Sequence, residues 1–303
     1  MDLLYLIIGL SLLVTGAEIV IKGSVSFGKK LNISLFAIGV VIVAGGTSLP
    51  ELASSINAVI NNHPDLAVGA VVGSNIANLI LVMAATAVIL PISNVTKNQI
   101  NQAWINIGLG VVLILMSFLY FNYLFGIVSM ILLILIMYLQ FKKSSLDLEE
   151  INKSEYSTIL SIFLILIGII FLIYGSELFV NSALRIANYF NVSEAVIGLS
   201  IIAFGTSLPE LVVGIMSAIK RKVDFALGNI LGSNIYNVLG VLGISSFFGS
   251  FSMPQIMVTQ DLLFMLLITF ITLGFMFFVK KIGRIYGSIG LILYACYIYF
   301  IFI

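Results

Sequence analysis

The sequence predicts an all-α membrane protein with about ten transmembrane helices in two inverted five-helix repeats. Three observations support this fold class: a very apolar composition, a series of long apolar segments, and a polar motif that occurs twice at an offset of 159 residues. Of the 303 residues, 61% are hydrophobic and 9% are charged, whereas roughly 25% of a soluble domain is charged. So few charges could not cover a soluble fold of this length. The net charge of +1 gives no indication of a nucleic-acid partner.

Ten segments of the chain are long and apolar enough to be candidate spans, since a helix needs ~20 apolar residues to cross a bilayer. Their apolar runs are unbroken rather than alternating, which argues against a β-barrel. The first segment lacks a basic flank and a cleavage site, so we expect a span and not a removed signal peptide. In chain order, the predicted spans are residues 3–28, 34–60, 66–90, 99–120, 122–141, 157–187, 194–219, 225–249, 257–279 and 284–303.

A polar connector at residues 142–156 separates a first repeat, residues 1–141, from a second repeat, residues 157–303. With five spans in each half, the second half must cross the membrane in the opposite sense, as in many secondary transporters. The alternative is a parallel duplication with an even number of spans per half, which would distribute basic residues to both sides of the membrane.

Basic residues favour one orientation, because the cytoplasmic connectors of membrane proteins are enriched in Lys and Arg. With the N-terminus outside, 12 of the 14 Lys and Arg residues fall in cytoplasmic connectors. We therefore expect a multi-pass protein of the cell membrane with both termini outside and residues 142–156 in the cytoplasm. The 12 residues are Lys29, Lys30, Lys97, Lys142, Lys143, Lys153, Lys220, Arg221, Lys222, Lys280, Lys281 and Arg284.

The repeated motif is Gly-Thr-Ser-Leu-Pro-Glu, at residues 46–51 and again at residues 205–210. The same offset relates Gly-Ser-Asn-Ile at 73–76 to 232–235, and 26 of the 69 positions from 16 to 84 are identical to their partners. A carboxylate and a proline are both costly inside an apolar helix. Because this costly combination occurs twice, we interpret it as a two-fold site for a cation.

The residue types around each proline favour a hard cation. Proline lacks an N–H and crowds the preceding turn, so Pro50 should interrupt its helix and free backbone carbonyls. Thr47 can share a helix face with Glu51, and Ser74 with Asn78; the second repeat has the same spacing. Carboxylate, hydroxyl, amide and carbonyl oxygens suit Ca²⁺ or Na⁺ rather than soft metals. Proline kinks also occur without any site, but two matched intramembrane glutamates make that interpretation the weaker one.

These motifs resemble the alpha repeats of the cation/calcium antiporter superfamily, most closely its prokaryotic sodium/calcium exchanger branch, over nearly the whole chain. The resemblance implies ten helices, with spans 2, 3, 7 and 8 around a central cation site and spans 1 and 6 sliding to alternate access. It also implies the ligands: bridging carboxylates of Glu51 and Glu210, carbonyls of Thr47, Thr206, Ala44 and Ala203, hydroxyls of Ser48, Ser207, Ser74 and Ser233, and side chains of Asn78 and Asn237.

Two departures bear on the subtype. Some archaeal relatives carry Asp at the position of Asn237, and potassium-dependent exchangers carry Asp in this region, so an Asn in both repeats favours a potassium-independent exchanger. Two carboxylates would give the site a charge of −2, which one Ca²⁺ neutralises, and the three-for-one exchange that the resemblance implies would be electrogenic. Gly45 corresponds to Phe204 in the second repeat, which should alter packing beside the first helix break.

We therefore expect a sodium/calcium antiporter that works by alternating access, whose partners are Na⁺, Ca²⁺ and the lipid bilayer, with no cofactor and no obligatory protein partner. A proton/calcium antiporter of the same fold, or one for another divalent cation, is the alternative. A channel would need a selectivity-filter loop that the sequence does not resemble. An enzyme is not expected, because Ser48 has no nearby His or Lys to activate it. Glu18 and Glu177 are also matched, and we expect them to be structural.

Overall fold

The computed structural model describes residues 1–143, 156–190 and 205–301. Seven helical stretches in these residues are long and apolar enough to cross a membrane, and a bent pair, Leu35–Thr47 and Leu49–Ile60, raises the number of candidate spans to eight. Two shorter apolar helices are α12 (Leu208–Ile219) and α17 (Arg284–Ile301). The long stretches are α1 (Asp2–Leu31), Pro64–Ile89, α7 (Lys97–Met116), α8 (Tyr123–Lys143), α9 (Thr158–Tyr189), Val223–Ser245 and Gln255–Val279.

Several helices change to wider π-helical turns along their length, and such turns occur frequently at functional sites. Three of these turns adjoin the repeated motif: η1 (Gly39–Val43), η2 (Asn78–Val82) and η5 (Tyr236–Leu242). The bounds of the remaining elements are α2 (Leu35–Ile38), α3 (Ala44–Thr47), α4 (Leu49–Ile60), α5 (Pro64–Ala77), α6 (Met83–Ile89), α13 (Val223–Ile235), α14 (Gly243–Ser245), α15 (Gln255–Met257), η6 (Val258–Leu262), α16 (Leu263–Gly274) and η7 (Phe275–Val279).

The helix break predicted at Pro50 is present. Helix α3 ends at Thr47 and α4 begins at Leu49, with a bend of 41° between the two parts. Pro50 lies in the first turn of α4, where a missing N–H costs no helical hydrogen bond. Ser48 has φ −83° and ψ 6°, and Ser207 before α12 has φ −85° and ψ 4°. The two copies of the motif therefore share one backbone geometry at the start of the second half-helix.

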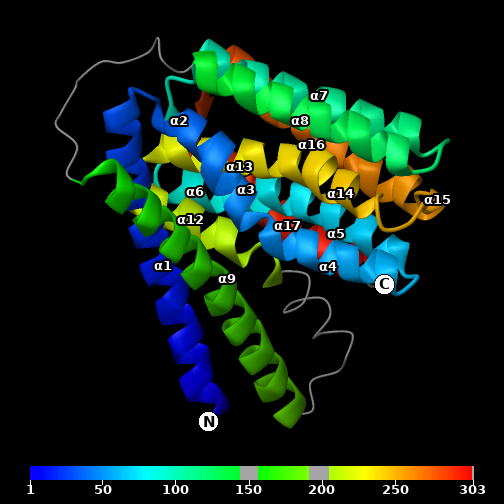
Figure 1. The fold of residues 1–303 in the computed structure, drawn as a ribbon, viewed down its shortest axis with the longest axis horizontal. Coiled ribbons are helices and arrows are strands. Elements are labelled where there is room, and N and C mark those ends of the chain that lie inside the picture. The colour runs from blue at the N-terminus through cyan, green and yellow to red at the C-terminus, as the bar shows by residue number, and fades with distance from the viewer. Residues whose placement is uncertain (144–155, 191–204, 302–303) are drawn as a thin grey trace.

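Helices α1 and α9 run side by side and are steeply inclined to the rest of the bundle (Figure 1). Glycines allow this close approach: a Cβ atom on Gly16 would lie 2.8 Å from the carbonyl oxygen of Gly168, and one on Gly9 would lie 2.9 Å from that of Gly175. Small residues at a helix interface are the usual means of close packing within a membrane. The glycines thus bring the two backbones together, and buried side chains such as Val20 and Leu172 pack beside them.

The matched glutamates of this pair differ in environment. Glu18 of α1 forms ion pairs with Lys22 at 3.1 Å and with Lys220, which follows α12, at 2.9 Å. Glu177 of α9 is exposed. The contacts of Glu18 fit the expected structural role.

Connectors predicted to lie on the same side of the membrane meet in the structure. Strand β1 (Ile92–Ser93) pairs antiparallel with β2 (Lys281–Ile282), which joins two connectors predicted to be cytoplasmic. Phe121 and Phe251 form an isolated β-bridge between two connectors predicted to be external. In both cases the two connectors that touch are ones predicted to lie on the same side of the membrane.

We predict that Gly16→Leu separates α1 from α9. The new side chain would meet the backbone of α9, and overpacking of this kind costs about 1–3 kcal/mol. The melting temperature of the detergent-solubilised protein should fall by several degrees. Gly108→Leu is the matched control, because Gly108 is exposed and a Cβ there meets nothing within 4 Å. Equal melting temperatures for the two variants would contradict this packing.

Candidate cation site

Glu51 and Glu210 lie at the centre of the site, in the first turns of α4 and α12. Both side chains are 0% exposed. Neither forms an ion pair with a Lys or Arg of the described residues. A buried carboxylate without a counter-charge costs several kcal/mol, so the site requires positive charge from another source.

Each carboxylate accepts a hydrogen bond from a serine of the same repeat. Ser74 Oγ donates to Glu51 Oε1 at 3.4 Å, and Ser233 Oγ donates to Glu210 Oε1 at 3.5 Å. The second oxygen of each carboxylate, Oε2, is buried and has no hydrogen-bond partner among the described residues. The repeats thus present two equivalent acceptor oxygens.

The same two serines connect the repeats. Ser207 Oγ of the second repeat donates to Ser74 Oγ at 3.4 Å, and Thr47 Oγ1 of the first repeat lies 3.4 Å from Ser233 Oγ. Each helix break therefore contacts the serine that binds the glutamate of the other repeat. The sequence-predicted hydroxyl residues are brought together around both carboxylates.

Asn78 and Asn237 are fully buried, and the Oδ1 atom of each has no partner within the described part of the chain. Their amide nitrogens are engaged: Asn78 Nδ2 donates to Asn234 Oδ1 and Asn237 Nδ2 donates to Asn75 Oδ1, both at 3.0 Å. Asn75 and Asn234 belong to the repeated Gly-Ser-Asn-Ile motif, but no role was predicted for them. Their repetition inside an apolar stretch was a signal that could have found them.

The other predicted ligands vary in their environment. Ser48 is buried, and its Oγ has no partner in residues 1–143, 156–190 or 205–301. The carbonyl of Ala44 accepts from Ser48 N at 3.0 Å and lies 3.3 Å from Thr47 Oγ1, so it is occupied in this conformation. Thr206 is half-buried. Ala203 lies outside the described residues.

The chemistry of the site is that of a hard cation. Among the described residues predicted as ligands, the unpaired acceptors belong to two carboxylates, two amides and one hydroxyl, and oxygen ligands of these kinds suit Ca²⁺ and Na⁺. The described residues contain no group of three His, Cys, Asp or Glu side chains that could hold a metal ion. The site therefore combines two anionic oxygens with neutral ones, and does not resemble a histidine or cysteine metal centre.

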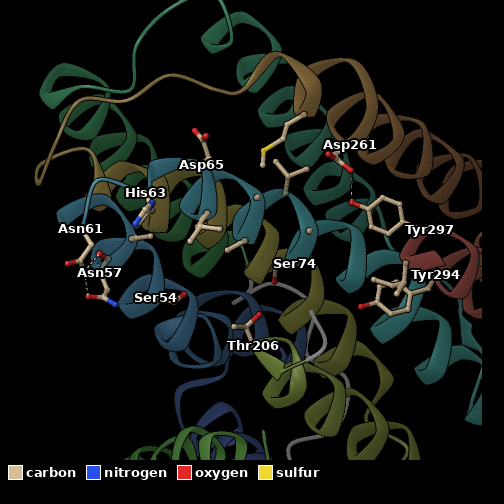
Figure 2. A pocket seen from close by; sticks show the side chains of 18 residues that line it. Ser54, Asn57, Asn61, His63, Asp65, Ser74, Thr206, Asp261, Tyr294 and Tyr297 are labelled. Carbon is tan, nitrogen blue, oxygen red and sulfur yellow. Dashed lines mark hydrogen bonds between the residues drawn. The ribbon is translucent and has the colours of Figure 1, made fainter. Parts of the chain in front are cut away.

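A cavity of about 1080 Å³ leads to this site from one end of the bundle (Figure 2). At its mouth lie two exposed residues: His63, in the turn between α4 and α5, and Asp65, in the first turn of α5. At its inner end lie Ser74 and Thr206. The hydroxyl that binds Glu51 is therefore reached from the end that carries His63.

The opposite approach to the site is filled. Thr47, the repeat partner of Thr206, is 0% exposed and donates through Oγ1 to Asn229 Oδ1 at 3.2 Å. Asn229 is also 0% exposed, and its repeat partner is Ala70, which lines the cavity. The amide of Asn229 thus fills space on one side of the site. On the other side, the smaller methyl group of Ala70 leaves the matched position open. No repeated pattern indicated Asn229, because the equivalent position in the first repeat holds an alanine.

The difference between Gly45 and Phe204 has a structural explanation on the side of Gly45. A Cβ at this position would lie 3.0 Å from the ring of Tyr236, whose hydroxyl donates to the Val41 carbonyl at 2.7 Å. The absence of a side chain at position 45 lets Tyr236 brace the π-helical turn η1. Phe204 lies outside the described residues.

We predict that the cavity makes Ala70 accessible to water and that Asn229 stays protected. In a Cys296→Ser background, Ala70→Cys should react with a charged thiol reagent, because Ala70 lines the cavity. Asn229→Cys occupies the matched position on the filled side and should react far more slowly. Labelling rates measured on the solubilised protein test this difference. Equal rates at the two positions would contradict a site open to one end only.

Comparisons with known proteins agree with this arrangement. The family described as sodium/calcium exchanger protein matches residues 1–142 and 160–303. An uncharacterized membrane protein of Methanocaldococcus jannaschii is 34% identical, over 96% of this chain and 94% of its own length. The sodium/calcium exchanger MaX1 of Methanosarcina acetivorans is 28% identical, over 99% of this chain and 98% of its own length.

A solved structure of the sodium-calcium exchanger NCX_Mj, soaked with Na⁺ and Sr²⁺, is similar to this fold with a TM-score of 0.87. The two sequences are 33% identical, and the similarity covers 98% of this chain and 97% of the other. With both halves matched by the family and near-complete coverage by relatives, the chain belongs to the sodium/calcium exchanger protein family.

Proposed function

We propose that this protein exchanges Na⁺ for Ca²⁺ across a membrane by alternating access. One observation carries the proposal: Glu51 and Glu210 are fully buried at matched positions, and each leaves one oxygen without a partner among the described residues. A mobile cation from solution can neutralise this pair. The family to which the chain belongs is described as sodium/calcium exchanger.

The proposed architecture is ten crossings in two inverted five-helix repeats, residues 1–141 and 157–303, joined by residues 142–156. Counting the bent pair and the two shorter apolar helices as spans, together with the seven long stretches, gives ten. Hydrogen bonds between matched residues of the two repeats support an inverted arrangement. Asn75 of the first repeat binds Asn237 of the second, and Asn234 of the second binds Asn78 of the first.

The proposed ligands are the carboxylates of Glu51 and Glu210 with the neutral oxygens around them. The unpaired oxygens of Ser48, Asn78 and Asn237 are the first candidates. The remaining candidates are Thr47, Thr206, Ser207, Ser74, Ser233, Ala44 and Ala203. Ala44 would become a ligand only if its carbonyl exchanged the hydrogen bonds it now accepts.

Charge determines the mechanism. The ionised site carries −2, because Asn78 and Asn237 are neutral, so one Ca²⁺ or two Na⁺ would neutralise it. A third Na⁺ would leave +1, which makes the exchange electrogenic. Na⁺ and Ca²⁺ compete for overlapping oxygens, and an empty site of charge −2 is costly to move through the apolar core. Exchange is therefore favoured over leak. Because both repeats hold Asn at these positions, we also propose that no K⁺ is required.

The orientation follows from the basic connectors. We propose a cell-membrane location with both termini outside and residues 142–156 inside, which makes the cavity at His63 an external opening. Helices α1 and α9, packed on each other through glycines, are then the unit that moves to close this side and open the other.

A proton/calcium exchanger of the same fold is the second candidate. Two buried glutamates without a basic partner in the described residues would also suit a site that takes up protons. The two mechanisms differ in what drives Ca²⁺ uptake, which decides between them.

We predict that proteoliposomes loaded with Na⁺ take up radioactive Ca²⁺ and that choline-loaded proteoliposomes do not. A proton ionophore should leave the uptake unchanged. Glu51→Gln and Glu210→Gln should each abolish uptake. Either change leaves the site with a charge of −1, so that bound Ca²⁺ would give it an uncompensated charge of +1. Glu177→Gln, a change of the same kind at an exposed glutamate, should retain it. Uptake driven only by a pH gradient would support the proton-coupled candidate, and full uptake by Glu51→Gln would overturn the mechanism.

We also predict that the membrane potential alters the rate. When three Na⁺ leave as one Ca²⁺ enters, one positive charge moves outward. An inside-positive potential, set with an inward K⁺ gradient and valinomycin, should therefore accelerate uptake, and an inside-negative potential should slow it. A rate independent of the potential would indicate electroneutral exchange.

A further inference from the structure

The structure assigns a positioning role to Asn75 and Asn234: each orients the amide of the other repeat's asparagine so that its oxygen, and not its nitrogen, faces the cation. We propose this on the basis of two matched hydrogen bonds. Asn237 Nδ2 donates to Asn75 Oδ1, and Asn78 Nδ2 donates to Asn234 Oδ1, both at 3.0 Å. The inference rests on the proposed cation exchange and concerns residues that would not themselves bind the ion.

The chemistry of the amide makes orientation decisive. An asparagine side chain has two donors on nitrogen and an acceptor oxygen, and the two ends are similar in size. With the oxygen inward, the amide attracts a cation; with the nitrogen inward, it presents N–H groups that repel one. Neutral Asn78 and Asn237 can therefore contribute to the site in only one of their two orientations.

The surroundings select that orientation. Asn237 Nδ2 also donates to Ser74 Oγ at 3.1 Å, so two acceptors hold the nitrogen on this side. A rotated Asn237 would place its oxygen against Asn75 Oδ1, where two acceptors repel each other. Asn75 is itself fixed, because its Nδ2 donates to the Asn234 carbonyl at 3.5 Å. The Oδ1 atoms of Asn78 and Asn237 then remain without partners in the described residues.

Both bonds also cross from one repeat to the other. Asn75 lies in α5 and contacts η5, while Asn234 lies in α13 and contacts η2. All four side chains are buried, so water is not in a position to replace these partners. The orientation of each ligand in one repeat is thereby controlled by the other repeat.

The first test is Asn75→Ala, assayed by Na⁺-driven Ca²⁺ uptake. The loss of a partner that orients a metal ligand typically weakens affinity by roughly tenfold or more, so we expect the KM for Ca²⁺ to rise by about tenfold with a smaller change in maximal rate. Asn106→Ala is the matched control. Asn106 is also buried and donates from Nδ2 to the Leu231 carbonyl at 3.2 Å, between α7 and α13. Its KM should match that of the unmodified protein.

A second background separates positioning from packing. In Asn237→Asp, both ends of the side chain are oxygens, so no orientation has to be selected. Asn75→Ala should then leave the KM unchanged or lower it, because the oxygen of Asn75 would repel the new carboxylate. If Asn75→Ala raises the KM equally in both backgrounds, Asn75 has a packing role and the proposal is wrong.

Two further measurements keep the outcomes distinct. Asn234→Ala, alone and combined with Asn78→Asp, tests the equivalent hydrogen bond to the asparagine of the first repeat. This pair of variants replaces those at Asn75 and Asn237 if Asn75→Ala does not fold. Equilibrium binding of radioactive Ca²⁺ to the solubilised protein should show the same pattern of affinities. An unmodified protein without Na⁺-driven uptake would overturn the proposed function, whereas normal exchange with Asn75→Ala equal to Asn106→Ala would overturn the positioning role alone.

Discussion

The burial of two carboxylates without a protein counter-charge is the constraint on which the rest of the site depends. Glu51 and Glu210 are fully buried, and each receives a hydrogen bond from one serine, which leaves one oxygen of each unpaired in the described residues. Hydrogen bonds of this kind offset only part of the cost of burying charge. A solvent-borne cation can offset the remainder. In the proposed mechanism, the cost of the empty state is the physical reason that exchange is favoured over leak.

The local backbone serves the same constraint. A continuous α-helix would pair every carbonyl internally, whereas the break before Pro50 and the adjoining π-helical turns change the direction of the chain at the site. The prolines occupy the first turn of the second half-helix, where they cost no hydrogen bond. The positive end of that half-helix also lies beside the glutamate, which moderates the charge of an unoccupied site without neutralising it.

Local rules made the breaks and the carboxylates predictable from the sequence. Proline interrupts a helix and glutamate is costly in an apolar span whatever the tertiary structure, so Pro50 and Glu51 could be singled out from their residue types. The exact repetition of the motif made a chance occurrence an unsatisfactory explanation. The span boundaries also agree closely, as with predicted residues 157–187 and the helix Thr158–Tyr189. The length criterion for a span identifies only seven or eight candidates among the described residues, because the bent pair is divided and α12 and α17 are short. The proposal of ten crossings thus depends on the sequence repeat and on which connectors lie on the same side of the membrane, and not on helix length alone.

Tertiary relations were not predictable in the same way. The bonds from Asn75 to Asn237 and from Asn234 to Asn78 join residues 162 and 156 positions apart, and no spacing rule within one helix indicates them. The contact between Thr47 and Asn229 could not be predicted for another reason. Asn229 corresponds to Ala70 in the first repeat, so it does not belong to the repeated pattern. Comparison of the repeats detects what is shared and is insensitive to differences.

Those differences matter for a two-state transporter. In the proposed inverted arrangement, identical repeats would make the two access states equivalent by two-fold rotation and equal in energy, so a preference for one state must come from unmatched residues. Asn229 fills one approach and Ala70 leaves the other open, while Tyr236 fits against Gly45 beside the first break. The proposed ligands are thus nearly symmetric, which would keep the cation site similar in both states, and the asymmetry lies in the residues immediately around them. A protein built in this way can change the preferred side of access by substitutions beside the site while the cation ligands stay the same.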